Sequence, residues 1–193
     1  PAPPLMDSTQ LARRIRAHAL RMVHAAKASH IGSALSIADI LAVLYAPGGL
    51  RLDPAKPDWS QRDRFLLSKG HACVAVYAAL AERGFFPVEE LATYGQDFAR
   101  LMNHISHKVP GVEFSTGSLG HALPFAVGKL LAARVRQPSR GEAWRCVVLL
   151  SDGAPASQKL SIASGGSKLI GGTLTAELTR DEVAEIVARG FFP

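Results

Sequence analysis

Three short polar segments of this 193-residue chain combine glycine with hydroxyl or imidazole groups. They are Ser29-His30-Ile31-Gly32, Ser68-Lys69-Gly70-His71 and Gly117-Ser118-Leu119-Gly120-His121. Each one immediately precedes a stretch that the sequence predicts to be helical. Backbone amides at a helix N-terminus bind phosphate well, and imidazoles there can donate to phosphate or to a developing oxyanion. One interpretation of these residues is therefore a site for a small phosphorylated ligand.

The same residues also have an ordinary structural interpretation. A histidine near a helix start often serves as a cap or as a satisfied core group, and Asp152-Gly153 alone is a common turn. At the end of a strand, however, the Asp152 carboxylate could hold a hard cation such as Mg²⁺ beside a diphosphate. His104 and His107 have the spacing H-x-x-H, but no third ligand accompanies them, so we do not expect zinc. Residue chemistry alone leaves both interpretations open.

The elements that must position these segments alternate between helices and strands. Apolar residues at helical spacing predict helices, with Ser8 and Ser36 as N-caps of the first two. Short strands are expected at Arg64–Leu67 and 144–150, and the second is nearly all apolar, which is typical of a strand covered on both faces. Polar residues that follow such a strand lie where open α/β sheets bind ligands, so the pattern predicts an α/β fold. The predicted helices cover residues 8–27, 36–46, 71–83, 88–94, 121–136 and a last stretch that begins near 179.

Composition excludes several classes of protein. The net charge is +6, but the basic residues are scattered among acidic ones, so nucleic-acid binding is the weaker interpretation and a small phosphorylated ligand would use the same charge. Cys73 and Cys146 lie in apolar runs without metal or disulfide spacing, and they are expected to be reduced core residues. No apolar stretch approaches the roughly 18 residues that cross a bilayer. The N-terminus lacks the apolar core of a signal peptide, so we expect a cytoplasmic protein.

Four segments of the chain are SHIGSALSIADILAVLY, RDRFLLSKGHACVAVYAALAERG, NHISHKVPGVEFSTGSLGHALPFAVGKLLAAR and VVLLSDG. In this order they resemble the N-terminal half of transketolase, the diphosphate-binding module of thiamin diphosphate enzymes. The resemblance runs from about residue 10 to Gly153. It implies a three-layer α/β/α thiamin diphosphate-binding fold, incomplete here, with the module at 1–153 and a divergent tail at 154–193 that ends in a short helix.

The resemblance assigns catalytic roles to two histidines. His30 and His104 match the histidines that face the sugar substrate, although the neighbours of His104 differ from the usual Gly-His-Pro. His71 matches the histidine that contacts the cofactor near its diphosphate. Such imidazoles would stabilise oxyanions that develop on the sugar.

The resemblance also implies cofactor and metal contacts. Gly117, Ser118 and Leu119 match the segment whose backbone meets the cofactor, and Gly153 matches the glycine that packs against the diphosphate. Asp152 matches the aspartate that binds the divalent metal. The implied cofactors are therefore thiamin diphosphate and Mg²⁺ (or Ca²⁺).

The chain departs from the family after Gly153. No asparagine follows Asn103, so the second side-chain ligand of the family's metal site is missing, and Ser157 stands where the family has glutamate. The later parallel strands and the separate pyrimidine-binding domain have no counterpart. We therefore expect residues 154–178 to be poorly ordered or loosely paired, although the glycine pair Gly171-Gly172 could form the turn of a hairpin.

The implied function is transfer of a two-carbon ketol unit from a ketose to an aldose. Phosphorylated sugars would be the substrates, and a pyrimidine-binding C-terminal transketolase section or a second copy would be the partner, with no role for nucleic acid or a membrane. Helices 71–83 and 121–136 carry few charges, so we expect a partner to bury their apolar faces, for example in a dimer.

Two alternatives differ from this function. The chain could be a non-catalytic truncated remnant or interaction protein, which the missing asparagine and Ser157 favour. It could also be part of another thiamin diphosphate-dependent synthase, as one of its subunits. The presence of His30, His71 and His104 together favours ketol transfer over that synthase.

Overall fold

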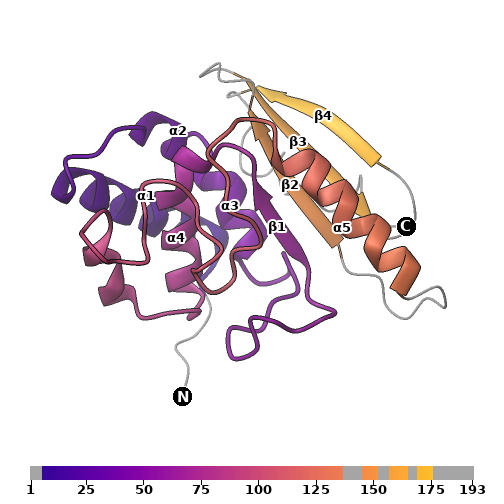
Figure 1. Cartoon of the computed structure of the whole chain (residues 1–193). Helices are drawn as coiled ribbons and strands as arrows, with labels where there is room; N and C mark the ends of the chain where they lie inside the picture. The colour runs from indigo at the N-terminus through magenta and orange to yellow at the C-terminus, as the bar shows by residue number, and fades with distance from the viewer. Residues whose placement is uncertain (1–5, 137–144, 152–156, 165–168, 176–193) are drawn as a thin grey trace.

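A four-stranded sheet separates two helical layers in the computed structural model of the chain (Figure 1). The structure describes residues 6–136, 145–151, 157–164 and 169–175. No helix within these ranges is long and apolar enough to cross a membrane. The elements are α1 (Ser8–Ala25), α2 (Ile31–Leu35), α3 (Ala38–Tyr45), β1 (Arg64–Leu67), the 3₁₀ turn η1 (Gly70–Ala72), α4 (Cys73–Glu82), the 3₁₀ helix η2 (Val88–Thr93), α5 (Ala122–Arg136), β2 (Arg145–Ser151), β3 (Ser157–Ser164) and β4 (Leu169–Thr175).

The sheet has the order β1-β2-β3-β4 and is parallel only between its first two strands. β1 pairs with β2 so that Arg64 lies opposite Cys146 and Leu67 lies opposite Leu149. Because β1 and β2 are parallel, their carboxyl ends meet at one edge of the sheet. The expected strands at Arg64–Leu67 and 144–150 are therefore confirmed to within one residue.

The tail pairs differently from the expectation. β3 runs antiparallel to β2, and β4 runs antiparallel to β3, each with a regular register. The loose pairing expected within 154–178 is therefore wrong for the two described strands. Gly171 lies within β4 opposite Ser161, so the hairpin does not turn at Gly171-Gly172. The second edge of β2 needs partners for its backbone groups, and an antiparallel neighbour supplies them through a short connection, whereas a parallel one needs a long crossover.

The two faces of β1 and β2 pack against different helices. Alternate residues point to opposite faces of a strand. Phe65 and Val147 belong to the core cluster with α1, α3 and α4, whereas Leu66 and Val148 pack with Ala122 of α5. The expected three-layer α/β/α arrangement is confirmed for these elements, and Figure 1 shows α5 on its own side of the sheet.

Helix α4 is buried by its own chain. Every residue from Cys73 to Ala81 is buried, among the residues of α1, α3 and η2. The expectation that a partner covers helix 71–83 is therefore wrong. Its weak amphipathicity reflects a position between other helices rather than an interface with another molecule.

Two expected helix starts also differ. The N-cap of α1 is Asp7, not Ser8, because the Asp7 carboxylate accepts a hydrogen bond of 2.8 Å from the Gln10 amide. The helix expected at 36–46 is divided into α2 and α3. Ser36 lies between them and donates its hydroxyl to the Ser33 carbonyl at 2.9 Å instead of capping α3.

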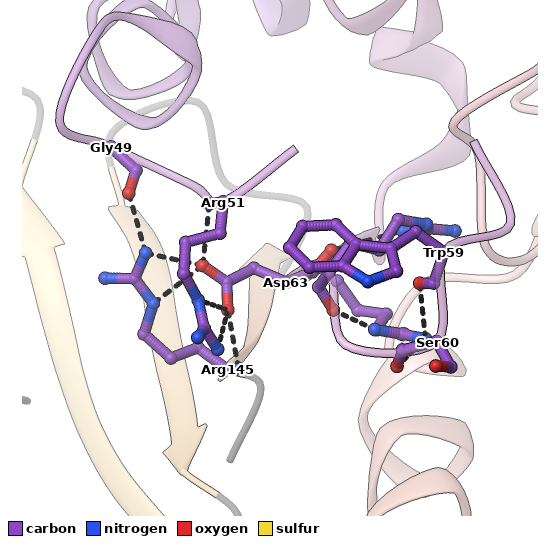
Figure 2. A network of polar contacts seen from close by, with 8 residues as sticks. Gly49, Arg51, Trp59, Ser60, Asp63 and Arg145 are labelled. Atoms are coloured by element: carbon purple, nitrogen blue, oxygen red, sulfur yellow. Dashed lines mark hydrogen bonds and ion pairs between the residues drawn. The ribbon is translucent and has the colours of Figure 1, made fainter. Parts of the chain in front are cut away.

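A buried carboxylate ties the amino ends of β1 and β2 together. Asp63 is fully buried, and it accepts hydrogen bonds from the backbone amides of Arg51 and Arg145 at 2.8 Å each and from the Arg145 guanidinium (Figure 2). Burial alone would raise the pKa of Asp63, but these donors together hold it below its ordinary value. Arg145 also donates to the Gly49 carbonyl at 2.6 Å. This cluster fixes the end of the strands opposite to the one that follows Leu67.

Candidate functional site

Three histidines from separate segments meet beyond the carboxyl end of β1. The ring centroids of His30 and His71 are 4.9 Å apart, and those of His30 and His104 are 6.4 Å apart. His30 precedes α2, His71 lies in η1, and His104 lies in the loop between η2 and α5. The structure thus brings together the three histidines that the sequence singled out, at the edge where open α/β sheets bind ligands. Their roles remain predictions.

His30 adopts an uncommon backbone conformation. Its φ of 71° is in the left-handed region, where histidine and asparagine are among the few residues other than glycine that occur. The side chain is exposed and makes no capping hydrogen bond to α2. A left-handed residue costs free energy of order 1 kcal/mol, and such residues concentrate at functional sites. The backbone at His30 therefore directs the imidazole into the cluster rather than along the helix.

His71 is the partly buried member of the cluster. Its Nε2 lies 2.8 Å from the Ser33 hydroxyl, which links η1 to α2. Burial, and then the positive charge that His30, Lys69 and His104 can carry, holds the pKa of His71 below its ordinary value. The ring is therefore mainly neutral at pH 7, with one nitrogen as donor and the other as acceptor.

The loop that carries His104 is fixed by contacts to α4 and η1. The buried Tyr77 donates its hydroxyl to the His104 carbonyl at 3.1 Å, and the Ile105 amide donates to the Gly70 carbonyl at 3.0 Å. Gly70 also lies against Thr116, since a Cβ at Gly70 would fall 1.8 Å from the Thr116 carbonyl oxygen. Only glycine permits this approach of two backbones.

The segment Gly117–Ser118–Leu119 lies beside His104 and is exposed. A Cβ at Gly117 would be 3.9 Å from the nearest atom, the Cδ2 of His104. The Thr116 hydroxyl donates to the Ser118 carbonyl at 2.9 Å, which shapes the turn before α5. The buried Ser68 hydroxyl accepts from the Ala122 amide at 3.2 Å and so joins the end of β1 to the start of α5. The geometry places this segment next to the histidines, but its contact with a cofactor stays a prediction.

Lys69 is a residue of the site to which the sequence assigned no role. It is only 2% exposed, and its ammonium donates to the Ser36 hydroxyl at 3.1 Å. Burial lowers its pKa to about 8. Its place two residues after β1 and directly before Gly70 was the one available signal, because Ser68 and Gly70 on either side of it are both buried.

Asp152 and Gly153, the residues assigned to the metal and the diphosphate, lie outside the described residues. Within the described ranges, no three His, Cys, Asp or Glu side chains are grouped so as to hold a metal ion. The described donors are imidazoles, an ammonium, hydroxyls and the amides before α5, which suit an anion. They fit the phosphate end of a cofactor, and the metal ligands stay a prediction.

The family is shown by comparison with known proteins. Residues 7–143 match the family model described as "Transketolase, thiamine diphosphate binding domain". A transketolase family protein of Sinorhizobium fredii is 48% identical over 143 residues, which cover 74% of this chain and 50% of that protein. The chain therefore belongs to the transketolase family, through its thiamin diphosphate-binding domain.

Two further relatives agree with this assignment. One of the subunits of the apulose-4-phosphate transketolase from Phocaeicola vulgatus is 38% identical over 138 residues, which cover 72% of this chain and 47% of that protein. The solved structure of transketolase from Leishmania mexicana matches with a TM-score of 0.69 and 30% identity over 77% of this chain and 23% of that one. The chain thus spans about half of the curated relatives named here and about a quarter of the solved transketolase.

Proposed function

We propose that this chain forms the diphosphate-binding part of a transketolase-type enzyme that moves a two-carbon ketol unit from a ketose to an aldose. The main support is that His30, His71 and His104 lie together at the carboxyl end of β1. The ring centroid of His30 is 4.9 Å from that of His71 and 6.4 Å from that of His104. Sugar ketol transfer develops negative charge on substrate oxygens, and two of these imidazoles, those of His30 and His104, are suited to stabilise it beside a cofactor that His71 contacts.

Each residue has a distinct part in this proposal. Thiamin diphosphate, when bound, supplies the carbanion that takes up and releases the two-carbon unit. His71 donates to the cofactor near its diphosphate, with Ser33 fixing the orientation of the ring. His30 and His104 face the sugar, donate hydrogen bonds to its oxygens and hold protons there. The backbone of Gly117, Ser118 and Leu119 lies along the cofactor, as the resemblance implies.

The metal and the partner belong to the same proposal. Asp152 would bind Mg²⁺ or Ca²⁺, and Gly153 would pack against the diphosphate. Phosphorylated sugars are the substrates, and a pyrimidine-binding transketolase section or a second copy completes the site; the Phocaeicola relative, named as one of the subunits of its transketolase, supports a divided enzyme. Cys73 and Cys146 are both buried free thiols, which supports a reducing compartment such as the cytoplasm.

A non-catalytic remnant is the second candidate. The antiparallel pairing of β3 with β2 favours it, because the sheet does not continue in parallel where the resemblance ends. In that case the histidine cluster would persist as a surface without a working metal site. The two candidates differ in whether a complementing section restores transfer.

The test is a complementation assay. The chain is mixed with a pyrimidine-binding section from a transketolase relative, and ketol transfer is measured with thiamin diphosphate and Mg²⁺. By itself the chain should show no measurable transfer. A graft of the family's own segment in place of 154–193 should give transfer that depends on His30 and His104. Absence of transfer from a folded graft that associates with the section would support the remnant.

A further inference from the structure

Lys69 is a buried cation at the base of the histidine cluster. It lies two residues after the end of β1 and is 2% exposed. Its ammonium donates to the Ser36 hydroxyl at 3.1 Å, Ser36 donates to the Ser33 carbonyl, and the Ser33 hydroxyl is 2.8 Å from His71 Nε2. This chain of polar contacts holds the ammonium on the side of the site where His71 lies.

The charge of Lys69 is uncompensated within the part of the chain that the structure describes. No carboxylate of those residues forms an ion pair with it, in contrast to Lys129, which pairs with Glu113. Lys69 lies close enough to His71 to be among the causes that lower the pKa of that imidazole, together with His30 and His104. Burying a cation without a counter-ion costs folding free energy, so Lys69 should destabilise the fold when no ligand is bound.

We propose that Lys69 is a binding residue of this site, whose ammonium pairs with a phosphate group of the bound ligand. The inference deepens the function proposed above and depends on it. A phosphate group would replace the missing counter-charge and would accept hydrogen bonds from the ammonium. The phosphate could belong to the cofactor's diphosphate or to a sugar phosphate, and both offer the same chemistry.

The first test is the affinity for inorganic diphosphate in EDTA, measured by calorimetry. Lys69→Met keeps the length of the side chain and removes the charge. It should bind diphosphate about tenfold to a hundredfold more weakly, the range for a lost hydrogen bond between charged groups. Lys108→Met is the matched control, because Lys108 is exposed on the loop of His104, and it should change the affinity less than about twofold. Equal affinities of the two variants would overturn the proposal.

The second test uses the unaltered chain, so its result does not depend on whether a variant folds. NMR of the unaltered chain with ¹³C-labelled lysine Cε follows the protonation of each ammonium. Burial should make Lys69 titrate near pH 8, below the ordinary range of a lysine, and saturating diphosphate should move its midpoint upward. An unmoved Lys69 signal at saturation would overturn the proposal.

Three further probes separate the sources of the phosphate. A shift with thiamin diphosphate, but not with thiamin or fructose 6-phosphate, assigns Lys69 to the cofactor. A shift with fructose 6-phosphate alone assigns it to the substrate. Thiamin diphosphate that shifts the His71 ring signals but not Lys69 would overturn only the Lys69 inference. Absence of any shift would remove the proposed function as well.

Discussion

His71 is the most buried imidazole of the cluster, and its protonation is set by its surroundings. Burial and the neighbouring groups His30, Lys69 and His104 lower its pKa, so the folded protein favours the neutral ring. An anionic ligand reverses part of this effect. The described residues of the site therefore favour an anionic ligand.

The histidines should separate into two classes when they are replaced. His71→Ala should weaken thiamin diphosphate binding by about one to two decades, because it removes a hydrogen bond to a charged group. His30→Asn and His104→Ala should leave cofactor affinity nearly unchanged and slow transfer in the complemented enzyme. Asparagine is chosen at position 30 because it tolerates the left-handed backbone. Equal losses of cofactor affinity in all three variants would mean that the histidines are structural.

His71 should also leave a signature in the pH dependence of stability. Its folded pKa lies below the ordinary value of 6.5, so protonation costs folding free energy. The unfolding free energy of the unaltered chain should therefore fall faster than that of His71→Gln as the pH drops below about 6.5, and the difference should be constant above it. Urea titrations between about pH 5 and pH 8 would measure this difference. Parallel curves over the whole range would contradict the assigned environment.

At the scale of elements, the site depends on the contact between η1 and the loop before α5. Gly70→Ala would place a Cβ 1.8 Å from the Thr116 carbonyl oxygen, so one backbone must move. We expect a loss of about 2–4 kcal/mol in unfolding free energy, as for other severe overpacking.

Gly117→Ala is the matched control for this substitution. The added Cβ would lie 3.9 Å from the nearest atom, which is an ordinary contact distance, so the unfolding temperature should be almost unchanged. If Gly117 lies along the cofactor, the Gly117→Ala variant should unfold at the same temperature as the unaltered chain but bind the cofactor more weakly. Equal stability of the two glycine variants would show that η1 and Thr116 are not in this close contact.

The amino ends of the strands should be acid-sensitive because of Asp63. The folded pKa of Asp63 is below its ordinary value of 3.8, so the carboxylate stabilises the fold above that pH and the contribution is lost as the pH falls through the folded pKa. Asp63→Asn removes the charge that pairs with Arg145 (Figure 2) and should cost about 3–5 kcal/mol near neutral pH, as for a broken buried ion pair. A guanidinium chloride series at neutral pH measures the loss. A stability equal to that of the unaltered chain would contradict the role of the cluster.

The sequence predicted the elements whose signals are local. The apolar run of β2 and the helical spacing of the apolar residues in α1 were both readable from residue type and spacing. The contact of Gly70 with Thr116 could not be predicted from the sequence, because it joins residues far apart in the sequence through backbone geometry alone. The pairing of β3 was missed for a different reason: because the family's later parallel strands have no counterpart here, we expected residues 154–178 to be poorly ordered or loosely paired and did not consider an antiparallel partner for β2.

At the scale of the whole molecule, α5 presents an apolar stripe to solvent. Val127, Leu131 and Val135 follow one another at helical spacing and are 41%, 55% and 81% exposed. The opposite side of α5 packs on the sheet through Ala122 and Ala126. We expect this stripe, and not helix α4, to contact the complementing section or a second copy.

Association through α5 should be sensitive to charge on the stripe. Leu131→Glu should weaken association with the complementing section, or shift a self-associated chain toward monomer, because it buries a charge in an apolar contact. Leu20→Glu is the control, since Leu20 of α1 is 51% exposed and lies outside the stripe. Light scattering over a range of concentrations measures both. A monodisperse monomer that binds no section and no apolar dye would contradict the assigned surface.

The central claim is that the histidine cluster at the end of β1 binds thiamin diphosphate through its phosphate end. Calorimetric titration of thiamin diphosphate with Mg²⁺, into the chain together with its complementing section, tests it most directly. We expect saturable heat at micromolar cofactor, no heat with thiamin, and weaker binding in His71→Ala. Equal heat with thiamin, equal affinity in His71→Ala, or no heat at all from a folded complex would contradict it.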